Sequence, residues 1–159
     1  MRAQPRNQIA KDAIKVWRIH ALIYIFILWI FIILLGLGTF LFSLPVYYIG
    51  IAVILGLILF YVFVLLMPKL RYRRWRYEIF EQEIYIQHGI LIVRRTIIPM
   101  IRVQHVDTVQ GPILKRYDLA TVSISTAATV HEIPALYEAD AENLRDRLST
   151  LARVDEEDV

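Results

Sequence analysis

The chain has 159 residues, 57% of them hydrophobic, and its 18 Lys and Arg against 15 Asp and Glu give a formal net charge of +3. Residues 1–76 hold ten basic side chains and one acidic one, whereas residues 77–159 hold eight basic and fourteen acidic ones. Such an apolar and unevenly charged composition excludes a disordered chain, a single soluble globule and a simple basic nucleic-acid binder. The absence of cysteine excludes disulfides, a thiolate nucleophile and Cys-ligated metal centres.

The segment 21–67 contains no charged side chain in 47 residues. A helix needs about 20 residues to cross a bilayer, so the segment is long enough for two crossings and too long for one. Pro45 lacks an amide hydrogen and disfavours helical geometry in the residue before it, which places the break at Ser43-Leu44-Pro45. The sequence therefore predicts a transmembrane hairpin with spans at about 21–42 and 46–67.

Basic residues flank both spans, and the short connection between the spans is uncharged. The N-terminal segment 1–20 carries five Lys and Arg, and a second cluster follows the second span: Lys69, Arg71, Arg73, Arg74 and Arg76. Because positive flanks stay in the cytoplasm, we expect a multi-pass protein of the cell membrane with both termini cytoplasmic. The cluster is interpreted as a set of membrane-surface contacts next to anionic lipid, with a specific lipid or nucleic-acid site as the less favoured alternative.

The pattern changes to a period of two after the spans. Alternation over 74–79 and 83–87, with Glu81-Gln82 between, predicts a β-hairpin with one buried face. Further strand material is expected at Ile90–Val93, Arg95–Ile98, Val103–Gln110, Thr121–Ser125 and Val130–Ile133, the last ending at Pro134.

A helical period follows the strands. Ala141, Leu144, Leu148 and Leu151 fall on one stripe, which predicts an amphipathic helix. The predicted fold is thus a two-helix transmembrane hairpin, then a small all-β barrel or sandwich over 68–154 capped by a C-terminal helix. Residues 155–159 are expected to form a solvated, disordered acidic tail.

Several motifs resemble the bacterial pleckstrin-homology (PH) domain of the membrane-flanked type. They are Ile98-Pro99 with Arg102-Val103-Gln104-His105-Val106, then Gln110-Gly111-Pro112, Leu119-Ala120-Thr121-Val122, Glu132-Ile133-Pro134 and the early Lys15-Val16-Trp17-Arg18. Two spans before one such domain is the layout of the YdbS-like membrane proteins, and the resemblance covers nearly the whole chain. It implies a PH-like fold. One departure is Asp118, where the family often has Gly, but Asp also tolerates left-handed backbone geometry.

Side chains that could perform catalysis do not converge in the sequence. The four histidines show no metal-ligand spacing, and His105 with Asp107 lacks a serine in a nucleophile elbow. We therefore expect no enzyme, no cofactor and no metal. The comparison with PH domains adds that phosphoinositide-binding members place Lys and Arg at the first strand–strand loop, where this chain has the acidic Phe80-Glu81-Gln82-Glu83.

The favoured functional interpretation is a membrane-anchored interaction module at the inner face of the cell membrane. A tethered domain meets a membrane partner at high effective concentration, and the resemblance suggests a related multi-domain membrane protein with similar PH-like domains, or a second copy of the chain. Candidate interface residues are Tyr85, His105 and Tyr117, because aromatic side chains concentrate interface energy. The alternative is a lipid-headgroup sensor using the juxtamembrane basic cluster with Arg94 and Arg95.

Overall fold

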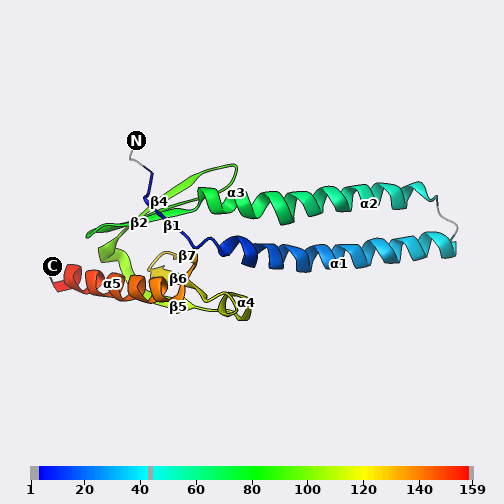
Figure 1. Cartoon of the computed structure of the whole chain (residues 1–159). Coiled ribbons are helices and arrows are strands. Elements are labelled where there is room, and N and C mark those ends of the chain that lie inside the picture. Colours follow the sequence, from blue (N-terminus) through cyan, green and yellow to red (C-terminus); the bar gives the residue numbers. More distant parts are fainter. Residues whose placement is uncertain (1–3, 43–44, 158–159) are drawn as a thin grey trace. The chain divides into compact units, whose positions relative to one another are not determined.

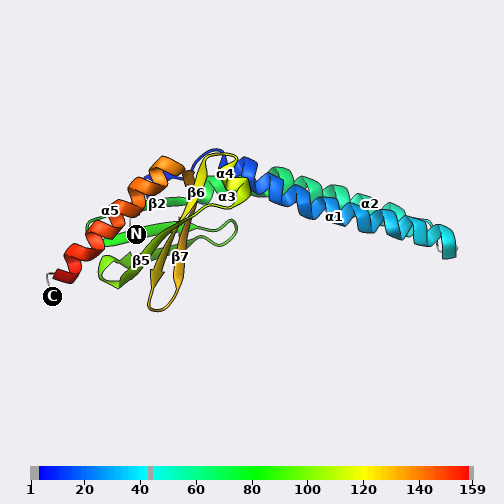
Figure 2. The same cartoon turned by 90° about the horizontal axis from the view of Figure 1, so that it is seen from below.

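The computed structural model of the chain describes residues 4–42 and 45–157, and side chains as far as residue 152. The chain forms two compact units (Figures 1 and 2). Residues 14–70 form one unit, called the helical unit below. Residues 1–13 and 71–159 together form the other, called the β unit.

The helical unit consists of two long apolar helices. The first is α1 (Ala13–Phe42); the second runs without a break through α2 (Tyr47–Phe60), the π-helical η1 (Tyr61–Leu66) and α3 (Met67–Arg74). With 30 and 28 residues, both are long and apolar enough to span a bilayer. Most of their large apolar side chains are exposed, as expected for helices that face lipid.

The two long helices approach closely at Gly56. A Cβ atom at position 56 would lie 3.0 Å from Cδ1 of Ile32 and 3.7 Å from Trp29. Gly56 therefore lets α2 pack directly on side chains of α1. The predicted break at Ser43-Leu44 lies outside the described residues, and the helices that flank it end at Phe42 and begin at Tyr47.

The first sheet of the β unit is antiparallel, with strand order β1-β2-β3-β4. Its strands are β1 (Asn7–Gln8), β2 (Arg76–Ile79), β3 (Glu83–His88) and β4 (Arg94–Pro99). Arg76 pairs with Gln87 and Ile79 with Ile84, so β2 and β3 form the predicted hairpin. The sequence did not predict β1, because a two-residue strand has no alternation to detect.

The second sheet is antiparallel with order β5-β6-β7. The 3-10 turn η2 (Met100–Arg102) leads into β5 (Val103–Val109), and the short helix α4 (Pro112–Lys115) connects it to β6 (Leu119–Thr126) and β7 (Val130–Tyr137). Asp118, before β6, has a φ of +51°, so it takes the left-handed geometry expected of it. The two sheets form a PH-like sandwich, and the described strands do not close into a barrel.

Helix α5 (Glu138–Glu157) packs along the second sheet (Figure 2). Three residues of its stripe are buried as predicted, with Ala141 and Leu148 fully inaccessible and Leu144 8% exposed, whereas Leu151 is half-buried. Branched side chains from both sheets are buried as well: Ile84, Ile86, Ile98, Val122, Ile124 and Ile133. The helix continues to Glu157, so the backbone of residues 155–157 is helical rather than disordered; residues 158 and 159 lie outside the described residues.

Two predictions about the β-strands were also wrong. Residues 90–93 form the loop between β3 and β4 rather than a strand, because Gly89, with a φ of +111°, turns the chain there. Strand β7 does not end at Pro134 but continues to Tyr137. Proline is tolerated there because β7 is an outer strand and its register with β6 is irregular between Ala120 and Val122.

The N-terminal segment 4–13 is an integral part of the β unit. Asn7 and Gln8 pair with Tyr77 and Arg76 of β2, and the backbone N–H of Ala10 donates to the carbonyl of Ala135 in β7 over 3.0 Å. This segment therefore joins the outer edges of both sheets. Its apolar side chains are buried: Pro5, Ile9, Ala10 and Ala13.

We predict that Ile9→Ala, at a position 3% exposed, lowers the free energy of unfolding of the β unit by about 2–5 kcal/mol, through lost burial and a residual cavity. Pulse proteolysis of the detergent-solubilised full chain across a urea gradient measures this change. Gln4→Ala, at an exposed position of the same segment, is the control and should change stability by less than about 0.5 kcal/mol. Equal stability of the two variants would contradict the docked N-terminal segment.

Candidate functional site

The register of the first sheet gives the β unit two distinct ends. Gln8, Arg76 and Gln87 lie side by side on neighbouring strands. The start of β2, the end of β3 and the β3–β4 loop therefore lie at the same end of the first sheet. The chain enters and leaves the β unit near these residues, at positions 13 and 71, and this end is called the junction end. The β2–β3 loop lies at the opposite end of the same strands, called the far end.

Most of the predicted basic cluster belongs to the junction end. Arg71, Arg73 and Arg74 are exposed on the last turns of α3, and Arg76 begins β2 half-buried. Lys69, also exposed, belongs to the helical unit. Arg94 and Arg95, exposed at the start of β4, extend the positive charge of the junction end across the sheet, because Arg94 pairs with His88 and Arg95 with Gln87.

The base of the β3–β4 loop is tightly packed. The ring of His88 stacks on the indole of the buried Trp75, with centroids 5.6 Å apart and planes inclined by 21°. Nε of Arg95 donates to Oε1 of Gln87 over 3.1 Å, and Gln87 is 3% exposed. These contacts hold both strands that enter the loop.

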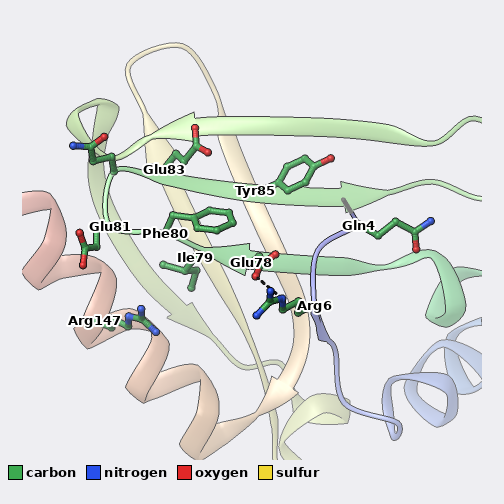
Figure 3. Close-up of a pocket in the computed structure, with 10 residues that line it drawn as sticks. Gln4, Arg6, Glu78, Ile79, Phe80, Glu81, Glu83, Tyr85 and Arg147 are labelled. Atoms are coloured by element: carbon green, nitrogen blue, oxygen red, sulfur yellow. Dashed lines mark ion pairs between the residues drawn. The ribbon is translucent and has the colours of Figure 1, made fainter. Parts of the chain in front are cut away.

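A hollow of about 940 Å³ lies at the far end (Figure 3). Glu78, Glu81 and Glu83 contribute three carboxylates to its lining. Nε of Arg6 lies 3.6 Å from Oε1 of Glu78, and Arg147 reaches the hollow from α5. Because the β2–β3 loop is acidic, its negative electrostatic potential opposes the binding of a phosphorylated headgroup.

A smaller groove of about 340 Å³ lies between β5 and α5. Among the described strands, β5 pairs only with β6, so its other edge has no strand partner. The groove is lined by five consecutive residues of β5 and two of α5: Val103, Gln104, His105, Val106, Asp107, Ser149 and Ala152.

The three candidate interface residues do not form one surface. His105 is exposed in the groove, whereas Tyr85 is only 4% exposed, because β3 lies between β2 and β4. Tyr117 is half-buried in the turn before β6. His105 pairs with Ser125, so it lies at the opposite end of β6 from Tyr117, about 20 Å away at a strand rise of about 3.3 Å per residue.

Sequence reasoning missed two surface features. The β5–α5 groove depends on contacts between elements that are about forty residues apart in the chain, and no local pattern reports such a contact. The exposed apolar tip of the β3–β4 loop had a signal: Leu91-Ile92 comes two residues after Gly89, a turn residue. Their apolar character led instead to a strand prediction.

Comparison with known proteins identifies the family. A family profile described as "Bacterial PH domain" matches residues 13–152. The chain belongs to this family. It is also 50% identical over 159 residues, the full length of both chains, to "UPF0699 transmembrane protein YdbS" of Bacillus subtilis (strain 168). No solved structure matches it.

The match of the bacterial PH domain profile begins at residue 13, the first residue of α1. The matched residues therefore include the two apolar helices as well as the sandwich. With a full-length transmembrane relative and two apolar helices, this chain is a transmembrane protein with a bacterial PH domain. In the part of the chain that the structure describes, no three His, Asp or Glu side chains are grouped as metal ligands. The absence of enzymatic activity stays a prediction.

We predict a depressed pKa for His88. Partial burial lowers the pKa of its imidazole, and the positive charges of Arg94, Arg71 and His131 lower it further. Protonation then favours the unfolded chain. The contribution of His88 to stability is therefore complete above the ordinary pKa of about 6.5, and it is lost as the pH falls from that value through the lowered pKa of the folded chain.

An NMR titration of the histidine ring signals, with His88→Gln to assign its resonance, measures this pKa. Arg94→Gln should move the pKa of His88 upward, whereas Arg147→Gln, at the far end, should leave it unchanged. A pKa for His88 at or above the ordinary value would contradict the packed, positively charged junction end.

Proposed function

We propose that this bacterial PH domain protein is a non-enzymatic, membrane-anchored interaction module whose β unit binds a membrane protein at the inner face of the cell membrane. The observation that carries this proposal is the unpaired edge of β5 beside the β5–α5 groove. An extended peptide can add to such an edge as a further strand: its backbone supplies hydrogen bonds, and its alternate side chains enter the neighbouring groove.

Among the outer strands of the described sheets that are longer than two residues, β5 is best suited to this role. Strand β7 contains Pro134, and the carbonyl of its Ala135 already accepts a bond from Ala10. Strand β4 carries Arg94 and Arg95 and ends at Pro99, and charge and proline both discourage strand addition. Strand β5 contains no proline. Gln104 and His105 are both exposed, and the following positions alternate between half-buried and exposed as far as Val109.

The proposed partner is a related membrane protein with similar PH-like domains, or a second copy of this chain. Such a partner is held in the same bilayer, so the hairpin raises its effective concentration at the groove. The alternative, a lipid-headgroup sensor, is disfavoured at the far end by the carboxylates of Glu78, Glu81 and Glu83.

We further propose that the hairpin crosses the membrane twice and leaves both termini in the cytoplasm. The pairing of β1 with β2 supports this topology, because the segments before and after the hairpin can fold into one unit only on the same side of a membrane. The arginines of the junction end favour the cytoplasmic side.

The topology is tested with single cysteines, since the natural sequence has none. Val46→Cys, in the exposed connection before α2, should react with an impermeant thiol reagent in intact cells. Thr150→Cys, exposed on α5, should react only after the membrane is permeabilised. The reverse pattern would contradict the proposed topology.

The groove is tested by filling it. Ala152→Arg introduces a long charged side chain into its lining and should abolish copurification of the partner from native membranes. Ala139→Arg, the same change at an exposed position near the start of α5, should leave the partner bound.

Two differently tagged copies of the chain, expressed together, distinguish a second copy from another membrane protein as the partner. Unfolding of each variant is measured alongside, so that loss of binding is not confused with loss of the fold. Equal capture by the folded Ala152→Arg and Ala139→Arg variants would contradict binding at the β5–α5 groove.

A further inference from the structure

Beyond partner binding, we propose that the β3–β4 loop inserts Leu91 and Ile92 into the headgroup layer of an anionic membrane. This would make the loop a third membrane contact of the chain besides the two helices. The inference concerns the orientation of the β unit on the bilayer and does not depend on the partner proposed for β5.

The first observation is the exposure of the loop. Leu91 is 92% exposed and Ile92 77%, whereas Ile101, the next large apolar side chain in the described part of the β unit, is 57% exposed. Two adjacent aliphatic side chains so fully in water mark a surface that binds something apolar.

The second observation is the position of the loop. It connects β3 to β4 at the junction end, where Gln87 lies beside Arg76 and Arg76 beside Gln8. The chain passes to the membrane-spanning helices from this end, since the β unit includes residue 13 on one side and residue 71 on the other. A bilayer is therefore the apolar phase that the chain itself brings within reach of this end.

The third observation is charge. Arg94 and Arg95 follow the tip and are exposed, as are Arg73 and Arg74 at the same end. Aliphatic side chains bordered by arginine match the boundary between acyl chains and anionic headgroups. The carboxylates of Glu81 and Glu83 lie at the far end, so the charge of the β unit favours presenting the junction end to an anionic surface.

The backbone of the β3–β4 loop is also preorganised. Gly89 has a φ of +111°, and a Cβ atom there would fall 2.0 Å from the carbonyl oxygen of Ile92, so only glycine allows this tight turn. The stacking of His88 on Trp75 and the bond from Arg95 to Gln87 hold its base. Insertion would therefore require little further ordering of the loop backbone, which lowers the entropic cost of binding to the membrane.

The test uses the full chain in lipid nanodiscs of phosphatidylcholine and phosphatidylglycerol, which contain no other membrane protein from the cell. Leu91→Cys and Ile92→Cys are labelled separately with an environment-sensitive fluorophore, with two quenchers: aqueous iodide and spin-labelled lipid. Val130→Cys is the matched control, because Val130 is apolar and 56% exposed. It lies in β7 rather than in the β3–β4 loop, and it pairs with Ser125 at the opposite end of β6 from Leu119.

Insertion predicts that the labels at 91 and 92 emit at shorter wavelength than the label at 130. They should lose most of their iodide quenching and be quenched by spin-labelled lipid. In discs of phosphatidylcholine alone, or with Arg94→Gln, the blue shift should decrease.

Iodide quenching at 91 and 92 equal to that at 130 would overturn the proposal. So would shielding from iodide without quenching by spin-labelled lipid, because that result means that protein, such as a second copy of the chain, covers the loop. The two label positions guard against a local disturbance by either cysteine.

Discussion

The backbone pairing of β1 with β2 is the interaction on which the rest of this structure depends. It joins residues 7–8 to residues 76–77, which precede and follow the hairpin of apolar helices. With the bond from Ala10 to Ala135, it makes the β unit discontinuous in sequence. Residues from both sides of the hairpin therefore build the PH-like sandwich.

The strand pairing of the first sheet also gives the β unit a basic end and an acidic end. The strand register brings the start of β2, the β3–β4 loop and their arginines to the junction end, and the acidic β2–β3 loop to the far end. The lipid contact and the partner-binding edge that we propose therefore use different surfaces. Leu91 and Ile92 lie at one end of the first sheet, whereas the groove follows β5 in the second.

The sequence predicted most of the fold because the signals were local. A long uncharged run, period-two alternation and the stripe of Leu144 and Leu148 each identify an element without knowledge of its neighbours. The structure departs from the predictions where long-range contacts decide: Asn7–Gln8 is a strand only because β2 lies beside it, and Tyr85 is buried because β3 is an inner strand. The groove at His105 likewise requires α5 beside β5. The acidic far end could be predicted because the alternation places Glu81-Gln82 between the two strands of a hairpin.

Amide hydrogen exchange of residues 7–10 in the full chain, reconstituted in lipid nanodiscs, tests the central claim most directly. If the segment before the hairpin completes the sandwich, the Ala10 amide, bonded to Ala135 over 3.0 Å, should exchange as slowly as the paired amides of β2. Exchange of residues 7–10 at the rate of an unstructured peptide, while β2 and β3 remain protected, would contradict a β unit built from both sides of the hairpin.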